Sequence, residues 1–310
     1  NRGYIFISSE EFMGKLKVAI LGSGNIGTDL LIKILRSDLL ECFLFVGRSL
    51  SSAGMQKASS LGVKISDKSI DAIIESKDEI DLVFDATSAA SHKKHALVFK
   101  ELKIKCIDMT PSQVGDICVP AINGVECLNS DNINMITCGG QASIPMAYTL
   151  YKNIKGIKYI EVVSIVASKS AGPGTRANID EYIENTEAGI KTLTGCSNVK
   201  AILNLNPATP CINMQTTIYV QVDEVDKGMV EGLKTPVKEM EGVIQKYVPG
   251  YEVIIPPVYE NGRILVMVKC RGLGDYLPRY AGNLDIINCA AIDMAEEYAK
   301  KCGKREVCKE

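Results

Sequence analysis

No apolar run in this sequence approaches the roughly 20 residues that a membrane-spanning helix needs. Lysine and arginine form no long block, and the formal net charge of the 310 residues is −2. Neither feature favours a membrane or a nucleic acid as a partner. The composition, 46% hydrophobic and 23% charged, is typical of a soluble globular protein with one large domain or two ordinary ones.

Disulfide and zinc patterns are missing as well. The cysteines number eleven, which is odd, and none forms a CxxC pair. Most lie between apolar residues, so we expect reduced thiols that pack as small hydrophobic side chains in a reducing cytoplasm. Histidine is scarce: His92 and His95 are the two in the sequence. They can pair with a ligand, but we interpret them as exposed residues of a helix. We predict no metal site.

The first 13 residues lack the basic start, long apolar core and cleavage site of a signal peptide. Met13 stands just before the first strongly predicted strand. We therefore interpret residues 1–13 as an expression-vector extension and exclude them from the prediction of the fold.

Short apolar segments alternate with helical segments as far as about residue 140. The segment Lys15–Leu21, KLKVAIL, is short and rich in branched residues, which is typical of a buried parallel strand. Further strands are expected at Cys42–Val46, Val63–Ile65, Asp81–Asp85, Lys105–Asp108 and Asn134–Thr137, with helices at Thr28–Arg36, Ile70–Ser76 and Ser91–Leu102. This alternation predicts right-handed βαβ units and an α/β fold with a doubly wound parallel sheet of the Rossmann type.

The pattern changes after about residue 157. Long segments rich in β-branched residues predict strands, and two helices are expected between them. The strands are Ile157–Ser168, Thr216–Val225 and Arg263–Arg271, and the helices are Ile179–Thr194 and Val230–Tyr247. Long strands with few helices indicate a mixed or antiparallel sheet with helices on one face, which is a separate α+β domain.

The end of the chain predicts one more helix, Asn283–Lys301, whose apolar residues return it to the first domain. We therefore expect a dinucleotide-binding domain over residues 14–140, completed by residues 284–302, and a second, α+β domain over residues 141–283.

A glycine-rich motif, GSGNIG at Gly22–Gly27, follows the first strand and opens a helix, which is the context that dinucleotide binding requires. Gly22 allows the tight turn, Gly24 lets the backbone approach a pyrophosphate, and Gly27 lets helix and strand pack closely. The positive end of the helix then faces the phosphates. A glycine-rich turn without a ligand is the alternative.

In dinucleotide-binding folds a residue at the end of the second strand contacts the ribose of the cofactor. Here that end is Val46-Gly-Arg-Ser49. An acid there favours NAD, and an arginine can accept the 2′-phosphate of NADP. Arg48 and Ser49 therefore leave the choice between NAD and NADP open.

Cys138 lies in the stretch NMITCGGQASIP, between the predicted strand that ends at Thr137 and a helix expected over Ala142–Lys152. The positive end of a helix lowers the pKa of a thiol. Gly139 and Gly140 leave backbone N–H groups exposed, and such groups can stabilise an oxyanion. Local sequence alone leaves a nucleophile and a buried structural thiol equally open.

Two other loops carry polar donors. The stretch SKSAGPGTRAN, Ser168–Asn178, ends a predicted strand and can grip a cofactor or a phosphate, or can be a surface loop. Asn283, in YAGNLD, can bond an amide-bearing ligand or cap the last helix.

Taken together, these motifs resemble those of one family. GSGNIG, DATSAASH, IDMTPSQVGDICVPAINGVE, NMITCGGQASIP, SKSAGPGTRANIDEY, LNPATP and YAGNLDI follow in the order and spacing of the acylating acetaldehyde dehydrogenases, the coenzyme A-dependent enzymes of aromatic meta-cleavage pathways. The resemblance covers about Lys15 to Lys301. It implies oxidation of acetaldehyde with NAD and coenzyme A (CoA) to acetyl-CoA, a homodimer formed through the second sheet, and a 4-hydroxy-2-oxovalerate aldolase as partner. It also makes residues 141–283 the catalytic and dimerisation domain.

The resemblance also implies residue roles. Cys138 is the nucleophile that carries the acyl thioester. The dinucleotide is bound by Ser23, Gly24, Asn25, Ile26, Ser170, Ala171, Gly172, Pro173, Gly174, Thr175, Arg176, Ala177, Asn178 and Asn283.

Two positions depart from the family. Where its members commonly have Met-Arg-Asp-Thr, this chain has Met214-Gln-Thr-Thr217, so Thr216 replaces the acid often assigned as the base. Ser49 replaces the acid common at the end of the second strand.

Two alternatives are compatible with the sequence. Phosphorylating and semialdehyde-type dehydrogenases also join a Rossmann domain to a catalytic cysteine, but they typically use a histidine of the second domain, and no histidine follows residue 95. A non-catalytic NAD(P)-binding protein is the second alternative.

Overall fold

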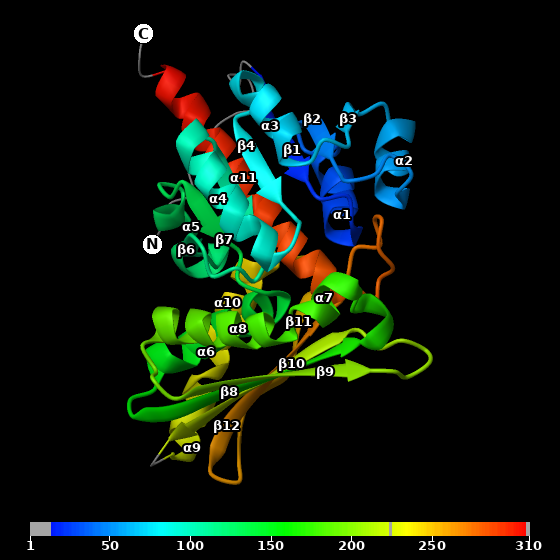
Figure 1. The fold of residues 1–310 in the computed structure, drawn as a ribbon. Helices are drawn as coiled ribbons and strands as arrows, with labels where there is room; N and C mark the ends of the chain where they lie inside the picture. The colour runs from blue at the N-terminus through cyan, green and yellow to red at the C-terminus, as the bar shows by residue number, and fades with distance from the viewer. Residues whose placement is uncertain (1–13, 223–224, 308–310) are drawn as a thin grey trace.

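A parallel sheet forms from the first half of the chain in the computed structural model, which describes residues 14–222 and 225–307 (Figure 1). The seven strands run in the order β3-β2-β1-β4-β5-β7-β6. They are β1 Leu16–Leu21, β2 Leu40–Val46, β3 Ile65–Ser66, β4 Leu82–Asp85, β5 Lys105–Asp108, β6 Asp116–Ile117 and β7 Asn132–Asn134. The residues interpreted as an expression-vector extension, 1–13, lie outside the described residues.

Helices cover both faces of this sheet, which confirms the doubly wound α/β fold. They are α1 Asn25–Ile34, α2 Ala53–Ser60, α3 Ile70–Glu75, α4 Ala89–Leu102 and α5 Pro120–Cys127, with the 3₁₀ turn η1 at Lys77–Glu79. The strand order reverses between β1 and β4, so the loops after these two strands flank the position where doubly wound sheets bind ligands.

The second sheet has five strands in the order β11-β12-β10-β8-β9 and is mixed, because β8 and β9 are parallel while the other pairs are antiparallel. The strands are β8 Ile157–Ala167, β9 Val199–Asn206, β10 Met214–Val222, β11 Tyr251–Glu260 and β12 Arg263–Cys270. This second, mixed-sheet domain is confirmed, although the sequence analysis predicted neither β9 nor β11.

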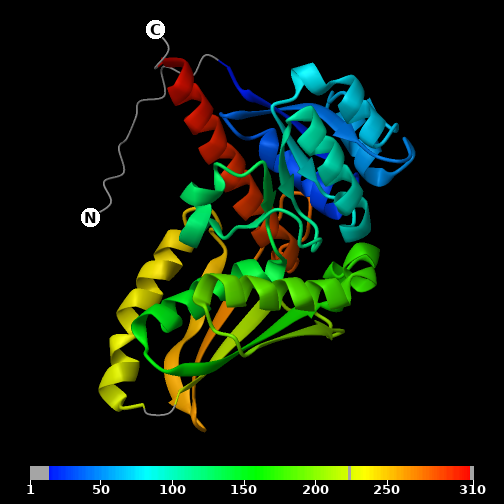
Figure 2. The same cartoon turned by 60° about the vertical axis from the view of Figure 1, so that its left-hand side comes forward.

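The core of the second domain lies between its sheet and the helices on one face (Figures 1 and 2). These helices are α6 Cys138–Asn153, α8 Ile179–Thr194 and α10 Lys234–Ile244; the shorter elements are η2 Ser168–Ser170, α7 Pro173–Ala177 and α9 Lys227–Gly232. Buried and half-buried residues alternate along β10, so the opposite face of the sheet is only half covered. The single helix expected over Val230–Tyr247 was wrong: α9 and α10 are separate.

The long helix α11, Gly282–Val307, connects the two parts of the molecule. Its residues Ala290, Ala291 and Met294 pack in the core of the parallel sheet, whereas Ile286 and Cys289 belong to the core of the second domain. The start of α11 therefore lies where the two domains meet. No helix in the described part of the chain is long and apolar enough to cross a membrane.

Candidate active site

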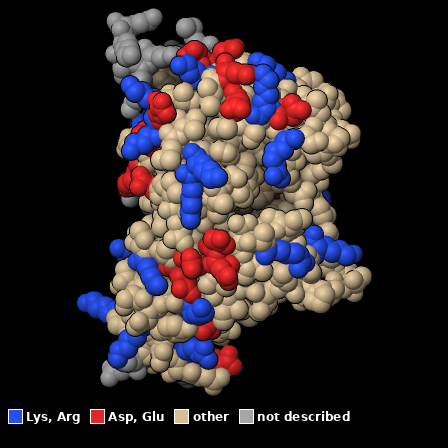
Figure 3. Space-filling model, viewed as in Figure 1, with Lys and Arg blue, Asp and Glu red and all other residues tan. Residues whose placement is uncertain are grey.

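A cleft lies where the loops after β1 and β4 face the second domain, and Figure 3 shows the hollow between the two halves of the molecule. Ala86, Thr87 and Ser88 line it from the loop after β4, and Ile287 lines it from α11. Six residues predicted to belong to the site line this one cleft: Ile26, Cys138, Gly174, Thr175, Asn178 and Asn283. Residues separated by more than 250 positions in the sequence are thus brought to one place.

The glycine-rich turn has the geometry that a dinucleotide requires. The φ angle of Gly22 is +126°, and a Cβ there would lie 2.5 Å from the carbonyl oxygen of Ala86. A Cβ at Gly27 would lie 1.8 Å from the carbonyl oxygen of Gly22, so α1 packs directly on the turn. Gly24 has open space around it. Ser23 is hydrogen-bonded to Ser52, and Asn25 is the first residue of α1.

Cys138 is the first residue of α6. Both the strand before this helix and the helix itself begin earlier than the sequence predicted. β7 ends at Asn134 instead of Thr137, and α6 begins at Cys138 instead of Ala142. Ile136 has a φ of +66°, which ends the strand, and the Thr137 side chain caps the helix. The sulfur therefore lies at the positive end of a 16-residue helix.

The glycines after Cys138 have a different role from the expected one. The N–H of Gly140 donates to Thr137 Oγ1 at 2.8 Å, so this group is already used in the helix cap. The N–H of Gly139 acts to lower the pKa of the Cys138 thiol. The region thus places donors around the sulfur itself.

Burial dominates the electrostatics of Cys138. It raises the pKa of the thiol to about 11, against hydrogen bonds from Tyr182 and from the N–H groups of Gly139 and Cys138. The expected lowering by the helix is thus present but smaller than the effect of burial. Tyr182 Oη lies 3.8 Å from Sγ, and this contact joins α8 to α6.

The loop predicted to grip the dinucleotide folds into η2 and α7. Arg176 holds it together, since its guanidinium donates to the carbonyl oxygens of Ala171 and Ser168. Ser170 donates to Ala167 within the same loop. Gly174, Thr175 and Asn178 face the cleft, whereas Ser170, Ala171, Gly172, Pro173, Arg176 and Ala177 do not line it.

Two buried polar atoms on the cleft have no hydrogen-bond partner among the described residues: Asn283 Oδ1 and Thr110 Oγ1. Buried polar groups are nearly always paired, so unpaired ones indicate a missing partner. A capping asparagine accepts through Oδ1, and this oxygen accepts nothing, so the capping alternative for Asn283 is wrong. An amide donor such as the carboxamide of a nicotinamide fits this oxygen.

A buried network supports the walls of the cleft from behind. Asp85 accepts from Thr87 at 2.5 Å, and Asp108 accepts from the N–H of Thr110 at 2.7 Å. His92 Nδ1 lies 2.9 Å from Asp85 Oδ2, and its Nε2 lies 3.4 Å from Asp108 Oδ2. His92 therefore links the ends of two neighbouring strands.

The expectation of two exposed histidines was wrong. His92 is fully buried, and His95 has a side chain that is 12% exposed and also bonds Asp85. Burial would lower the pKa of His92, but the bond to Asp85 and the charge of Asp108 outweigh it, and the pKa is raised. Burial raises the pKa of Asp108 to about 6. Against burial, the bonds with His92 and His95 lower the pKa of Asp85 to about 2.

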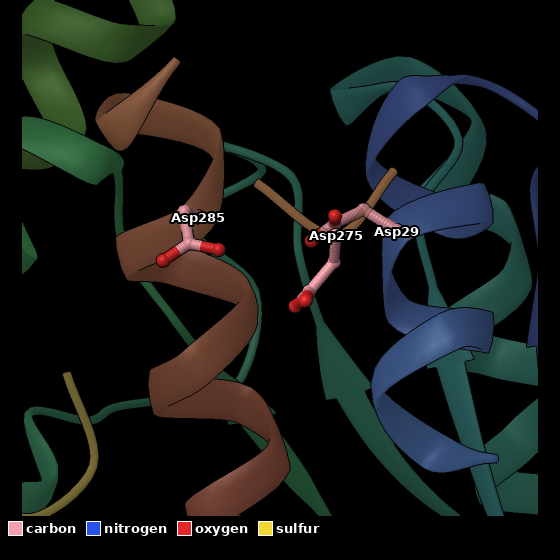
Figure 4. Close-up of side chains that lie close together, drawn as sticks. All are labelled: Asp29, Asp275 and Asp285. Atoms are coloured by element: carbon pink, nitrogen blue, oxygen red, sulfur yellow. The ribbon is translucent and has the colours of Figure 1, made fainter. Parts of the chain in front are cut away.

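A second cluster fixes the start of α11. Figure 4 shows Asp29 on α1, Asp275 on the loop before α11 and Asp285 on α11, with their carboxylates close together. The Lys33 ammonium contacts all three, at 2.9, 2.9 and 2.7 Å respectively. Lys33 thereby holds α11 against α1, two residues beyond Asn283.

Two family models match separate stretches of the chain. Residues 17–129 match a family model described as the NAD binding domain of semialdehyde dehydrogenase. Residues 138–278 match one described as prokaryotic acetaldehyde dehydrogenase, dimerisation.

The chain is 58% identical to the acetaldehyde dehydrogenase of Spirochaeta aurantia over 92% of its length and 95% of that protein. It is 52% identical to the acetaldehyde dehydrogenase of Pectobacterium atrosepticum over 91% of its length and 95% of that protein. The chain belongs to the acetaldehyde dehydrogenase family.

The acetaldehyde dehydrogenase fold is shared with more distant proteins. Aspartate semialdehyde dehydrogenase from Candida albicans, solved with NADP, superposes with a TM-score of 0.65 at 13% identity. The superposition covers 92% of this chain and 100% of the Candida albicans chain. This likeness concerns the fold alone.

Several residues of the cleft were not singled out from the sequence, among them Thr87, Thr110 and Tyr182. Thr87 and Thr110 lie in the family motifs DATS and DMTP, directly beyond β4 and β5, and a threonine after a parallel strand is a usable signal. Tyr182 is the last residue of the motif SKSAGPGTRANIDEY, but nothing in that stretch places it beside Cys138. The hydroxyl of Thr216, where family members commonly have an acid, lies 3.0 Å from Ser164 Oγ on β8.

Proposed function

We propose that this chain oxidises acetaldehyde with NAD and coenzyme A to acetyl-CoA through a thioester on Cys138. One observation carries the proposal: the Cys138 sulfur and the unpaired amide oxygen of Asn283 lie on the same cleft, at the reversal point of the parallel sheet. A nucleophile beside a nicotinamide position is the arrangement that aldehyde oxidation requires. The names of the similar proteins support the substrate.

The chemistry at the sulfur follows from its surroundings. The thiol loses its proton, and the thiolate forms a bond to the carbonyl carbon of the aldehyde. A nicotinamide cofactor, when bound, accepts the hydrogen of that carbon as hydride. The acyl group is left on Cys138, and the CoA thiol then displaces it, which returns the proton to the Cys138 sulfur. Donors around Sγ are needed because burial raises the thiol pKa to about 11.

The dinucleotide position follows from the same cleft. Gly24 lies free at the start of α1 for the pyrophosphate, and Ile26, Thr175 and Asn178 face the cleft between the two domains. We propose NAD as the cofactor because the family resemblance implies it. Arg48 and Ser49 are exposed beyond β2, and neither is an acid, so NADP also fits this end of the site.

The oligomer and the setting are part of the proposal. Val163, Thr217 and Met267 form one half-buried row on the less covered face of the second sheet. We propose that two copies pair through this face, which the match to a dimerisation model supports. Ten free cysteines in the described residues fit a reducing cytoplasm. The resemblance supports an aldolase as the supplier of the aldehyde.

Intact mass spectrometry tests the function. The protein is mixed with acetaldehyde and NAD without CoA, and an acetyl adduct on Cys138 is expected that CoA removes. Cys138→Ser, which nearly preserves size, serves as the control and should form no stable adduct. Dinucleotide binding with no adduct in the unmodified protein would contradict the proposal and favour a non-catalytic NAD(P)-binding protein.

The same experiment addresses the phosphorylating alternative. Inorganic phosphate replaces CoA in the second step, and no discharge of the adduct is expected. Within the described residues, both histidines belong to the first domain and bond Asp85, which leaves the second domain without the histidine that the alternative needs. Faster discharge by phosphate than by CoA would favour the alternative.

A further inference from the structure

Three hydroxyl groups lead from the second sheet to the Cys138 sulfur. Thr216 Oγ1 on β10 lies 3.0 Å from Ser164 Oγ on the neighbouring strand β8. Ser164 Oγ and Tyr182 Oη face the same position beside Cys138, since a Cβ at Gly139 would lie 3.0 Å from the first and 2.0 Å from the second. Tyr182 Oη in turn lies 3.8 Å from the Cys138 Sγ. Among the described residues, no carboxylate or imidazole is hydrogen-bonded to this sulfur. Tyr182 is its side-chain partner.

These groups are closed off from solvent. Thr216 is fully buried, Ser164 is 2% exposed and Tyr182 is 7% exposed. Inside a protein a hydrogen bond is stronger than in water, and bonds in series polarise one another. The three hydroxyls thus act on the sulfur with little competition from water.

The direction of the bonds can follow the charge of the sulfur. While Cys138 is a thiol, its S–H donates to Tyr182 Oη. Each hydroxyl can both donate and accept, so Tyr182 can turn to donate to a thiolate. Ser164 then donates to Tyr182, and Thr216 donates to Ser164.

We propose that Tyr182 is a catalytic residue that stabilises the Cys138 thiolate by donating a hydrogen bond to it, and that Ser164 and Thr216 are positioning residues that orient and polarise the Tyr182 hydroxyl. The inference rests on the proposed function, in which Cys138 reacts as a thiolate. It concerns the acid–base state of the sulfur and involves no proton transfer to Tyr182: the thiol proton leaves through the cleft, to which Cys138 is partly open.

Tyr182→Phe tests the inference, because it removes the hydroxyl and keeps the buried ring. The rate of Cys138 alkylation by iodoacetamide is measured between pH 7 and pH 10 by peptide mass mapping, without aldehyde, dinucleotide or CoA. Hydrogen bonds to charged groups are strong, so their loss lowers the thiolate fraction, and we expect the Cys138 rate to fall about tenfold at each pH in this range. An unchanged or faster rate at Cys138 would overturn the inference.

Each digest contains its own control. Cys211 is half-buried, and no contact joins it to Tyr182 among the described residues, so its alkylation rate should be the same in both proteins. Thr216→Val removes a hydroxyl that lies farther from the sulfur than that of Tyr182, so it should lower the Cys138 rate by less than Tyr182→Phe does. Thr216→Ser keeps a hydroxyl and should have the Cys138 rate of the unmodified protein. Equal Cys138 rates in the valine and serine variants would overturn the role of Thr216.

The readout separates this inference from the proposed function. Alkylation reports on the thiolate alone, whereas the acetyl adduct reports on aldehyde oxidation. A protein that forms no acetyl adduct, yet shows the slower alkylation in Tyr182→Phe, would contradict the function and support the role of Tyr182 at the sulfur. The reverse result would leave the function standing and remove Tyr182 from it.

Discussion

A β-carbon at position 139 would lie 2.0 Å from the hydroxyl oxygen of Tyr182. Gly139 and Tyr182 are thus packed with no space between them, directly beside the Cys138 sulfur. The glycine is needed because the tyrosine hydroxyl occupies the place of its side chain. This relationship explains the first of the two glycines of the CGG motif by packing, whereas the sequence suggested an exposed N–H group for an oxyanion.

Gly139→Ala is therefore expected to displace Tyr182 or the first turn of α6, since buried groups cannot share one volume. Misplacement of a reacting group by about 1 Å can cost about 100-fold in rate, and we expect a fall in kcat of that order. Steady-state assays with acetaldehyde, NAD and CoA measure it.

Gly242→Ala is the matched control, because Gly242 lies inside α10 and a Cβ there would meet nothing within 4 Å. Alanine favours a helix interior over glycine by about 1 kcal/mol, so this variant should keep its activity and unfold at higher urea concentration. Full activity of Gly139→Ala would show that the contact with Tyr182 is not needed.

Regular elements with a clear apolar period could be predicted from the sequence. The helix Ile179–Thr194 and the strand Lys105–Asp108 have the bounds expected for them. The strand β11 was missed because Pro256 and Pro257 argue against a strand, and prolines are tolerated here at the edge of the sheet.

The site could be predicted only in part, for physical reasons. Two glycines weaken a helix by propensity, so the start of α6 at Cys138 depends on the Thr137 cap, which propensity does not reveal. The contact of Tyr182 with Cys138 joins residues 44 positions apart on two helices. His92 was misplaced because the two carboxylates that make its burial possible belong to neighbouring strands.

The buried His92 should make stability depend on pH. Its pKa in the folded protein is raised above the unfolded value of about 6.5. Its contribution is therefore fully present below about pH 6.5 and is lost as the pH rises through the folded pKa. We expect His92→Gln to be less stable at pH 6 and to lose less stability between pH 6 and pH 9 than the unmodified protein. Urea unfolding at several pH values measures both effects.

His95→Gln is the control for this prediction. His95 bonds the same Asp85 oxygen, but its side chain reaches solvent and it makes no contact with Asp108. The variant should keep the pH slope of the unmodified protein. Parallel slopes for His92→Gln and the unmodified protein would contradict the role assigned to His92.

The end of β2 should decide between the two dinucleotides. Arg48 is exposed beyond this strand, where an arginine can bind the 2′-phosphate that NADP has and NAD lacks. A hydrogen bond to a charged group contributes about 1.5–3 kcal/mol, so Arg48→Ala should weaken NADP binding about tenfold or more and leave NAD binding nearly unchanged. Calorimetric titration with both dinucleotides measures this, and Ser49→Asp should shift the preference toward NAD. Equal losses for both dinucleotides would place Arg48 away from the ribose.

Replacing Lys33 should cost much of the free energy of unfolding, because three carboxylates surround its ammonium group. Its side chain is 5% exposed, and its ammonium contacts Asp29, Asp275 and Asp285. Removing one partner of a buried ion pair costs about 3–5 kcal/mol, since the remaining charges stay buried without compensation. We expect Lys33→Met to lower the free energy of unfolding in urea by this amount. It should also weaken dinucleotide binding, because Asp285 anchors the turn that holds Asn283.

Lys68→Met is the control for this prediction. It removes an exposed ion pair with Glu75 and should change neither the free energy of unfolding nor dinucleotide binding. If both lysine variants were equally stable, the cluster would not hold α11 in place.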